Sequence, residues 1–399
     1  MICRTIVDSV RSYISGSVLL IVMSLVAISS LHAQDLQPQK QVLFDAGDGG
    51  IHLYRIPGIV VTPKGTILAY CEARKNAKKD WGEIEVHLRR SIDGGKTWVP
   101  SRRIAHEGTR FEGTPSTKNG PKEQTVNNPV AIIDPQTGAI EFLYCVNYAR
   151  CFSMRSVDDA VTFSQPIEIT SCFEKFRERY DWNVIATGPG HGIALPSGRL
   201  VVPIWLAYGK PGDHAPSATA TIYSDDHGKS WHAGQIAVPN QDEYQNPNET
   251  MIALRSNRDV MLITRSVSKP NRKIITTSPT GIDSWSKPRF HSELWEPICM
   301  ASLLALPNEP GCMLFSNPRT LGLDKEGKEV PAGRGKRENL TVHLSRDDGE
   351  TWPIHKTLES GPSAYSDLAQ LPNGKILCLY EGKDRIHLAT FDLAWLTQP

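Results

Sequence analysis

The chain of 399 residues carries 44 basic and 43 acidic side chains, which gives a formal net charge of +1. Hydrophobic residues make up 40% and charged residues 22% of the sequence, so a disordered or fibrous protein is excluded. The balanced charge argues against nucleic acid as a partner, and any anionic ligand must be bound by a local cluster of cations.

Residues 1–33 have the pattern of a secretory signal peptide. Two arginines precede an apolar run from Val18 to Val26, and Ala33 is a small residue suited to a cleavage site. A membrane anchor is the alternative, but the run is shorter than the ~20 residues that span a bilayer, and no later segment is apolar enough. We therefore expect a mature chain of residues 34–399 that is secreted or periplasmic and has no membrane span.

A short motif, Ser-x-Asp-x-Gly-x-Ser/Thr-Trp, recurs along the chain. Three complete copies begin at Ser91, Ser224 and Ser345, a weaker copy begins at Ser156, and a degenerate one begins at Ser278. Their spacing of roughly sixty residues predicts one repeated supersecondary unit, somewhat longer than the ~50 residues of a kelch blade. Ser and Asp side chains bond nearby backbone groups and Gly supplies a positive φ, as tight hairpin turns require.

The aspartates of these motifs, Asp93, Asp226 and Asp347, are therefore predicted to build turns rather than to serve in catalysis or metal binding. Between the motifs the chain has the pattern of short strands separated by Gly and Pro, as from 58 to 70 and from 371 to 380. Radial repetition of such units leaves only short, protected sheet edges. The repeat length divides the mature chain into about six units, so we expect an all-β, six-bladed β-propeller with these motifs in its hairpin turns.

The cysteines indicate neither a disulfide framework nor a zinc site, because they are irregularly spaced and no Cys-x-x-Cys pair occurs. We interpret them as buried thiols that act as small hydrophobic side chains. The sequence predicts no metal and no cofactor.

Motifs of this kind occur in several propeller families, so they predict the fold and leave the function open. The more specific feature is Tyr54-Arg55-Ile56-Pro57, which precedes the first strand pair and the first motif copy. With this combination the chain resembles the sialidase (neuraminidase) family, whose six-bladed propeller opens with an Arg-Ile-Pro motif. Further matches follow in the family's order over nearly the whole mature chain, at 188–192, 248–249, 264–266, 337–342 and 364–368.

The resemblance implies three arginines that bind the carboxylate of sialic acid, and the matching positions are Arg55, Arg265 and Arg337. A planar guanidinium suits this task, because it holds a carboxylate through two parallel charge-assisted hydrogen bonds and does not lose its proton. Arg74 resembles a fourth family arginine that borders the site.

The resemblance also implies a tyrosine nucleophile, Tyr365, activated by a glutamate, Glu249. Sialic acid carries a carboxylate on its anomeric carbon, so a carboxylate nucleophile would approach against a like charge. A neutral phenol that loses its proton to a nearby base avoids this repulsion. Sialidases are a known exception to the two-carboxylate scheme of most glycosidases.

The general acid is predicted to be Asp80, which would protonate the leaving oxygen and later deprotonate the attacking water. This role requires a pKa raised by apolar cover, and Trp81 is a candidate for that cover. Glu83 and Glu85 are the alternatives, and their spacing predicts a strand with both side chains on one face.

Together these residues imply an exo-α-sialidase that acts on sialylated glycoproteins, glycolipids and oligosaccharides. Three alternatives stay open: a trans-sialidase, a hydrolase of a related ulosonic acid such as the deaminated sugar, and a non-catalytic propeller that binds sialic acid. The presence of Tyr365, Glu249 and Asp80 argues against the non-catalytic alternative.

Overall fold

The computed structural model describes residues 37–76, 79–108, 110–112, 118–120, 122–323, 326, 329–331 and 336–398. The predicted signal peptide, residues 1–33, lies outside this part of the chain. Among the described residues, no helix has both the length and the apolar character needed to cross a membrane.

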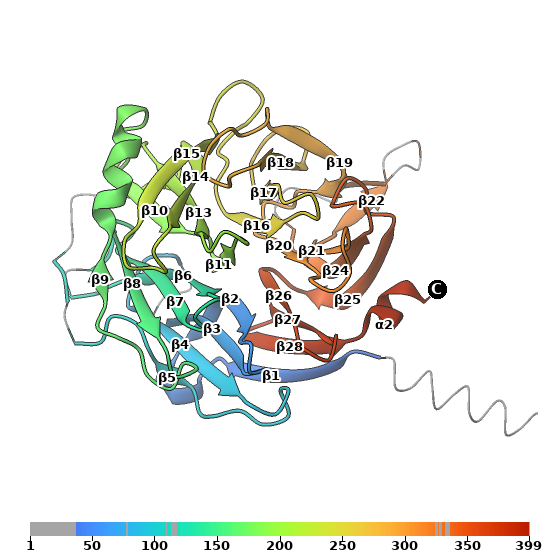
Figure 1. Ribbon diagram of the computed structural model, residues 1–399, viewed down its shortest axis with the longest axis horizontal. Coiled ribbons are helices and arrows are strands. Elements are labelled where there is room, and N and C mark those ends of the chain that lie inside the picture. Colours follow the sequence, from blue (N-terminus) through green and yellow to red (C-terminus); the bar gives the residue numbers. More distant parts are fainter. Residues whose placement is uncertain are drawn as a thin grey trace, which may run out of the picture.

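Six mainly antiparallel sheets surround a central axis (Figure 1). The first consists of β2 (Leu53–Val61), β3 (Ile67–Arg74), β4 (Ile84–Ser91) and β5 (Arg102–Arg103). The second consists of β6 (Val126–Ile133), β7 (Ile140–Val146), β8 (Arg150–Ser156) and β9 (Ile167–Glu168), with β11 (Gly190–His191) parallel to β6. The third consists of β10 (Val184–Thr187), β13 (Leu200–Ala207), β14 (Ser217–Ser224) and β15 (His232–Val238), with β12 (Ile193–Ala194) beside β13.

The remaining sheets continue in the same order around the axis. The fourth consists of β16 (Thr250–Leu254), β17 (Val260–Thr264), β18 (Arg272–Ser278) and β19 (Arg289–Trp295). The fifth consists of β20 (Ser302–Ala305), β21 (Met313–Pro318), β24 (Glu338–Ser345) and β25 (Ile354–Pro362). The sixth consists of β26 (Ser366–Gln370), β27 (Ile376–Glu381), β28 (Arg385–Phe391) and β1 (Gln39–Asp45). Outside the sheets lie η1 (Asp48–Gly50), η2 (Thr170–Glu178), the hairpin β22 (Leu321–Leu323) and β23 (Glu329–Pro331), and α2 (Leu393–Thr397). The prediction of an all-β, six-bladed propeller is confirmed.

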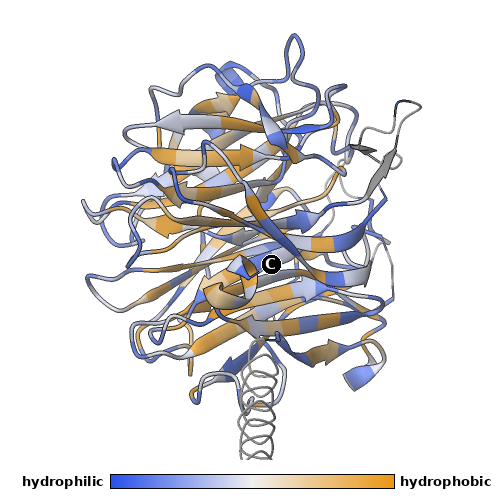
Figure 2. Cartoon of the chain, turned by 90° about the vertical axis from the view of Figure 1, so that its right-hand side faces the viewer, coloured by the Kyte–Doolittle hydropathy of each residue, from blue (hydrophilic) through white to orange (hydrophobic). Residues whose placement is uncertain are grey.

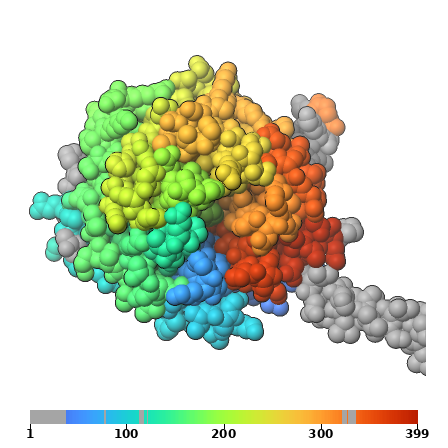
Figure 3. Space-filling view, viewed as in Figure 1, coloured from blue at the N-terminus to red at the C-terminus, as the bar shows by residue number. Residues whose placement is uncertain are grey.

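The two ends of the described chain meet in the sixth sheet. Strand β1 pairs antiparallel with β28, with Gln39 opposite Thr390. Figure 3 shows the result, since the blue start of the chain lies beside its red end. This pairing closes the ring, and closure protects sheet edges that would otherwise be free to pair with other chains.

The hydrophobic core lies between neighbouring sheets rather than at one centre. Strands β3 and β7 are buried along their whole length, because both of their faces pack against other sheets. Figure 2 shows the hydrophobic residues along the stacked strands and the hydrophilic ones mostly in the connecting loops. All cysteines of the described chain are free thiols, and only Cys172 is not fully buried.

The repeated motifs form hairpin turns that are held by their own side chains. In the first copy, Ser91 Oγ donates to Asp93 at 2.8 Å, and the backbone N–H and the hydroxyl of Thr97 donate to the same carboxylate at 2.9 and 2.6 Å. The copies at 156, 224 and 345 repeat this pattern. The degenerate copy differs, because Thr280 stands at the aspartate position and instead donates to Asp283.

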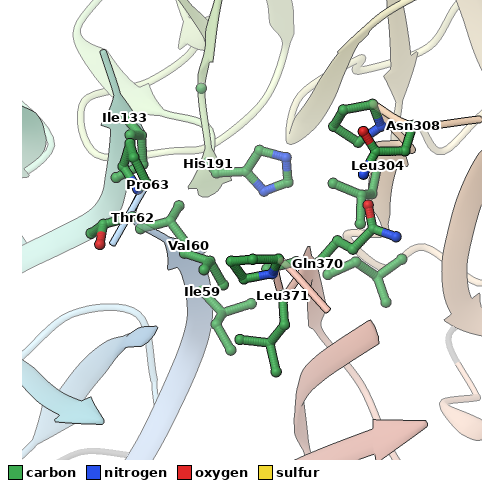
Figure 4. A pocket seen from close by; sticks show the side chains of 16 residues that line it. Ile59, Val60, Thr62, Pro63, Ile133, His191, Leu304, Asn308, Gln370 and Leu371 are labelled. Atoms are coloured by element: carbon green, nitrogen blue, oxygen red, sulfur yellow. The ribbon is translucent and has the colours of Figure 1, made fainter. Parts of the chain in front are cut away.

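An apolar cavity of about 360 Å³ opens on the axis at one end of the inner strands. Its walls include residues 59–63 at the end of β2 and residues 368–372 at the end of β26, and His191 projects between them (Figure 4). The buried carboxylate of Asp367 accepts a hydrogen bond from His191 Nδ1 at 2.8 Å. None of the residues predicted to act on a substrate lines this cavity.

Candidate active site

A second cavity, of about 240 Å³, lies at the opposite end of the inner strands, because β2 and β26 each run from one cavity to the other. All six sheets or the loops at their ends contribute to its wall. Every predicted site residue lines it except Arg74. The lining residues are Arg55, Ile56, Asp80, Asn128, Tyr148, Trp205, His214, Asn248, Glu249, Arg265, Arg337 and Tyr365.

The phenol of Tyr365 lies at the centre of a short hydrogen-bond network. Its hydroxyl donates to Glu249 Oε1 at 2.5 Å and accepts from Arg265 Nη1 at 2.7 Å. Arg265 Nη1 also donates to the other oxygen of Glu249. Burial raises the pKa of Tyr365 well above its usual value, and Glu249 adds to this rise while Arg265, Arg337 and Arg55 oppose it. The raised pKa favours the protonated phenol, which donates its hydrogen bond to a carboxylate.

Arg55 is held in place by a residue that the sequence did not single out. Its Nε and Nη2 donate to the two oxygens of Glu381, each at 3.1 Å. Glu381 also accepts the backbone N–H of Ile56 at 2.8 Å. This carboxylate ends the buried strand β27, and a charged residue after five apolar ones is the signal that could have revealed it. Burial alone would lower the pKa of Arg55, but Glu381 and Tyr365 raise it well above its usual value.

The three predicted arginines converge on the phenol from three different sheets. The guanidinium carbons of Arg55 and Arg337 lie 5.1 and 5.3 Å from the centre of the Tyr365 ring. Arg337 Nη2 donates to the backbone carbonyl of Ile298 at 2.6 Å. Within the described chain, the buried Nε of Arg265 has no hydrogen-bond partner. The cavity therefore offers a concentrated positive charge suited to a carboxylate.

Arg74 differs from the other three arginines, because its side chain is fully buried. It donates to Glu72 at 2.7 Å, to Asp80 at 3.0 Å and to the carbonyl of Lys79 at 2.8 Å. It therefore stands behind Asp80 and holds this carboxylate toward the cavity. It supports the site wall without forming part of it.

Asp80 borders the arginine cluster, with Oδ1 3.7 Å from Arg55 Nη1 and 47% of its side chain exposed. Partial burial raises its pKa, but Arg74, Arg55 and His214 lower it more, so the pKa lies below its usual value. The expected rise through apolar cover is thus absent from the free protein, because two guanidinium groups outweigh the desolvation. Trp81, the candidate for that cover, does not line the cavity.

The alternative acids Glu83 and Glu85 lie away from the cavity and are engaged elsewhere. Glu83 pairs with Arg110 at 2.6 Å, and Glu85 pairs with Lys75 at 2.6 Å and with His87 at 3.0 Å. Neither lines the cavity. Among the three candidate acids, only Asp80 faces the arginine cluster.

A further part of the cavity wall is aromatic and was not predicted. The rings of Tyr148 and Trp205 lie 4.6 and 5.2 Å from that of His214. Burial lowers the pKa of His214, so its imidazole is neutral at neutral pH. In the described chain, His214 Nε2 and Trp205 Nε1 are buried without hydrogen-bond partners. No motif marks these residues, since an aromatic in a β protein is usually a core residue.

Three residues that line the cavity have unusual backbone conformations. Ile56, Asn128 and Tyr148 have φ angles of 59°, 52° and 50°. A positive φ is uncommon for side chains other than glycine and a marked outlier for a β-branched residue such as isoleucine. Such conformations persist where surrounding contacts enforce them, which is frequent at functional sites. Among the described residues, no group of three or more His, Cys, Asp or Glu is arranged to hold a metal ion.

Comparisons with known proteins identify a matching family model, several relatives in sequence and several similar solved structures. Residues 108–378 match the family model described as a BNR repeat-like domain. A sialidase of Bacteroides fragilis is 30% identical over 369 residues, which cover 84% of this chain and 61% of that relative. A sialidase of Micromonospora viridifaciens is 28% identical over 386 residues, which cover 90% of this chain and 54% of that relative. The chain thus spans less than two thirds of the length of both relatives. Among solved structures, the Hadza microbial sialidase Hz136 is 26% identical, has a TM-score of 0.72, and is aligned over 90% of this chain and 69% of that one.

Proposed function

Because the chain belongs to the sialidase family of BNR-repeat proteins, we propose that it is an exo-α-sialidase that removes terminal α-linked sialic acids from glycans with retention of configuration. The observation that carries this proposal is the hydrogen bond from Tyr365 to Glu249 within a cluster of three arginines. A phenol paired with a base is an activated nucleophile, and the arginines match a substrate that is both a glycoside and a carboxylate.

In the first chemical step, the oxygen of Tyr365 attacks the anomeric carbon of the sialoside while its proton passes to Glu249. The bond from the anomeric carbon to the leaving oxygen breaks, and Asp80 supplies a proton to that oxygen. The products of this step are the free aglycone and a sialosyl group bound to Tyr365. The 2.5 Å contact between the phenol and Glu249 supports this proton transfer, because it already lies along its path.

In the second step, water attacks the anomeric carbon from the side that the aglycone has left. Asp80, now a carboxylate, takes a proton from this water. The bond to Tyr365 breaks, and the phenolate recovers its proton from Glu249. Two successive inversions return the sugar with its original α configuration.

The lowered pKa of Asp80 in the free protein is compatible with its role as an acid. Arg55 is one of the two arginines that lower this pKa, and it is also one of the proposed carboxylate ligands. A bound substrate carboxylate adds a negative charge beside Arg55 and so offsets part of its effect on Asp80. The pKa of Asp80 therefore rises when the substrate binds, which favours the protonated form that the first step needs.

We also propose that the chain is secreted or periplasmic, with residues 1–33 as a cleaved signal peptide and residues 34–399 as the propeller domain. Its partners are then sialylated glycoproteins, glycolipids and oligosaccharides outside the cytoplasm. Mass spectrometry of the exported protein would find a mature N-terminus near residue 34, whereas an intact leader would refute this part of the proposal.

The mechanism is tested by trapping the covalent intermediate with 2,3-difluorosialic acid. The sialosyl mass is expected on the peptide that contains Tyr365, and proton NMR of a natural sialoside digest is expected to show the α anomer first. Label on Asp80 or Glu249, or initial release of the β anomer, would overturn the mechanism. The same digest with added lactose measures transfer, and a sialylated lactose product would identify a trans-sialidase instead.

A further inference from the structure

A fully buried ion pair lies behind the arginine cluster and outside the cavity wall. Lys273, in β18, and Glu296, directly after β19, approach to 2.8 Å, and both side chains are 1% exposed. Neither lines the cavity. A buried ion pair is weak evidence for stability, because desolvation of two charges offsets most of their attraction. The position of this pair is better explained by the backbone groups to which it is hydrogen-bonded.

Glu296 holds one end of the peptide group whose other end holds Arg337. Glu296 Oε1 accepts the backbone N–H of Cys299 at 3.0 Å, while the carbonyl of Ile298 accepts Arg337 Nη2 at 2.6 Å. This N–H and this carbonyl belong to one planar trans peptide, so they point in opposite directions. The direction of the N–H toward Glu296 therefore fixes the direction of the carbonyl toward Arg337.

Lys273 supports the same segment through the next carbonyl, that of Cys299. Its Nζ donates to the carbonyl of Cys299 at 2.6 Å as well as to Glu296. Ile298 has a φ angle of 58°. In the described chain, Ile298 and Ile56 are the β-branched residues with a positive φ. Such a conformation is strained and persists only where neighbouring contacts enforce it. The bonds to Cys299 from Glu296 and Lys273 provide that enforcement.

The other oxygen of Glu296 reaches the backbone of a second arginine. Oε2 accepts the N–H of Ser266 at 3.3 Å, and the carbonyl of the same peptide group, that of Arg265, accepts the N–H of Asn248 at 3.0 Å. A single carboxylate thus contacts the peptide that follows Arg265 and the peptide that anchors Arg337. These two arginines come from different sheets, so their relative position is not set by either sheet alone.

We propose that Glu296, charge-paired with Lys273, is a positioning residue that sets Arg265 and Arg337 in register to bind one ligand carboxylate. This inference rests on the proposed function, in which these arginines hold the carboxylate of sialic acid. Loss of the Glu296 carboxylate leaves both arginine side chains unchanged, but it removes the hydrogen bonds that fix the backbone next to Arg265 and the peptide group that anchors Arg337. Binding of carboxylate ligands then weakens more than binding of neutral ones.

The test compares Glu296→Gln with Glu293→Gln in the full chain. Glu293 is the matched control, because it lies in the adjoining strand and accepts a backbone N–H, that of Trp352, away from the cavity. The ligands are the inhibitor 2,3-didehydro-2-deoxy-N-acetylneuraminic acid and its methyl ester. We expect E296Q to bind the acid at least ~10-fold more weakly than the parent, because small misplacements of binding groups have effects of this size. Its affinity for the ester should not change. E293Q should bind both ligands like the parent.

A merely structural role would lower the affinity for acid and ester alike, and that outcome would overturn the inference. Thermal melting shows whether E296Q folds. If it does not, the double variant Lys273→Met with Glu296→Gln replaces it in the binding test, because this variant removes both buried charges. Unchanged acid affinity in a folded variant also overturns the inference. By contrast, a parent protein that neither binds the acid nor cleaves a sialoside refutes the proposed function itself.

Discussion

The motif aspartates in the hairpin turns at the rim of the propeller and the carboxylates at its axis differ in where their partners lie along the chain. At the rim, Asp347 accepts hydrogen bonds from Ser345 and from both the backbone and the hydroxyl of Thr351, all within four residues. Each turn of this kind is complete in itself, so it forms wherever the motif occurs. The repetition of the motif in the sequence is the direct result.

At the axis, carboxylates bind partners that are far away in the chain. Glu381 binds Arg55 across 326 residues, and Glu249 accepts from Tyr365 across 116 residues. These contacts exist only once the ring has closed. The comparison teaches that the motif aspartates stabilise their own turns locally, whereas the axial carboxylates Glu381 and Glu249 reach their partners only through the fold. In the proposed function, these axial carboxylates serve binding and catalysis. Substitutions at the two places should therefore affect different measurements.

The largest effect is expected from Tyr365→Phe at the axis. Loss of the hydroxyl removes the proposed nucleophile, so kcat should fall by at least about 10³-fold on a fluorogenic sialoside, as for other lost nucleophiles. Calorimetric affinity for the didehydro inhibitor should survive, because the arginines remain. A kcat within tenfold of the parent would contradict the nucleophilic role, and an equal melting temperature serves as the control for folding.

The next effect in size is expected from Arg55→Ala. This change removes one proposed ligand of the substrate carboxylate and leaves Glu381 buried without its guanidinium partner, so inhibitor binding should weaken by about 2–5 kcal/mol. Arg289→Ala is the control, since this arginine is 51% exposed and pairs with Glu350 on the surface. Equal inhibitor affinity of R55A and R289A would show that Arg55 does not contact the ligand.

A smaller effect is expected from Arg74→Gln, which tests whether this residue acts through Asp80. Arg74 lowers the pKa of Asp80, so its loss raises that pKa, and the acid form persists to higher pH. The basic limb of the pH profile of kcat/KM should therefore move to higher pH. The double variant with Glu72→Gln controls for the carboxylate that R74Q leaves buried. A loss of inhibitor affinity without any shift of the limb would instead indicate direct contact with the ligand.

The smallest effect is expected from Asp347→Ala at the rim. The turn loses hydrogen bonds from its own backbone and hydroxyls, which should lower the free energy of unfolding by about 1 kcal/mol. Denaturant unfolding measures this change. Activity on the fluorogenic sialoside should stay at the parent level, because Asp347 does not line the cavity. A fall in kcat without a fall in stability would break the distinction between rim and axis.

Much of the site could be predicted because family motifs mark individual positions. Arg55, Arg265 and Tyr365 lie in three such segments, and the structure brings all of them to one cavity together with Asp80, Glu249 and Arg337. The supporting residues could not be predicted in the same way. Glu381 ends the apolar strand β27 and Glu296 directly follows the mixed strand β19, and nothing in their local sequence indicates which arginine each of them supports.

The sequence by itself determined the repeated hairpins and hence the propeller, because each turn is satisfied by residues within its own motif. Tertiary structure alone decided which charges meet at the axis. It placed Arg74 behind Asp80 rather than in the wall, and it assembled the aromatic wall of Tyr148, Trp205 and His214 from separate loops and strands. The physical reason is that electrostatic and packing contacts depend on distance in space, and the closed ring joins residues whose separation in the sequence carries no such information.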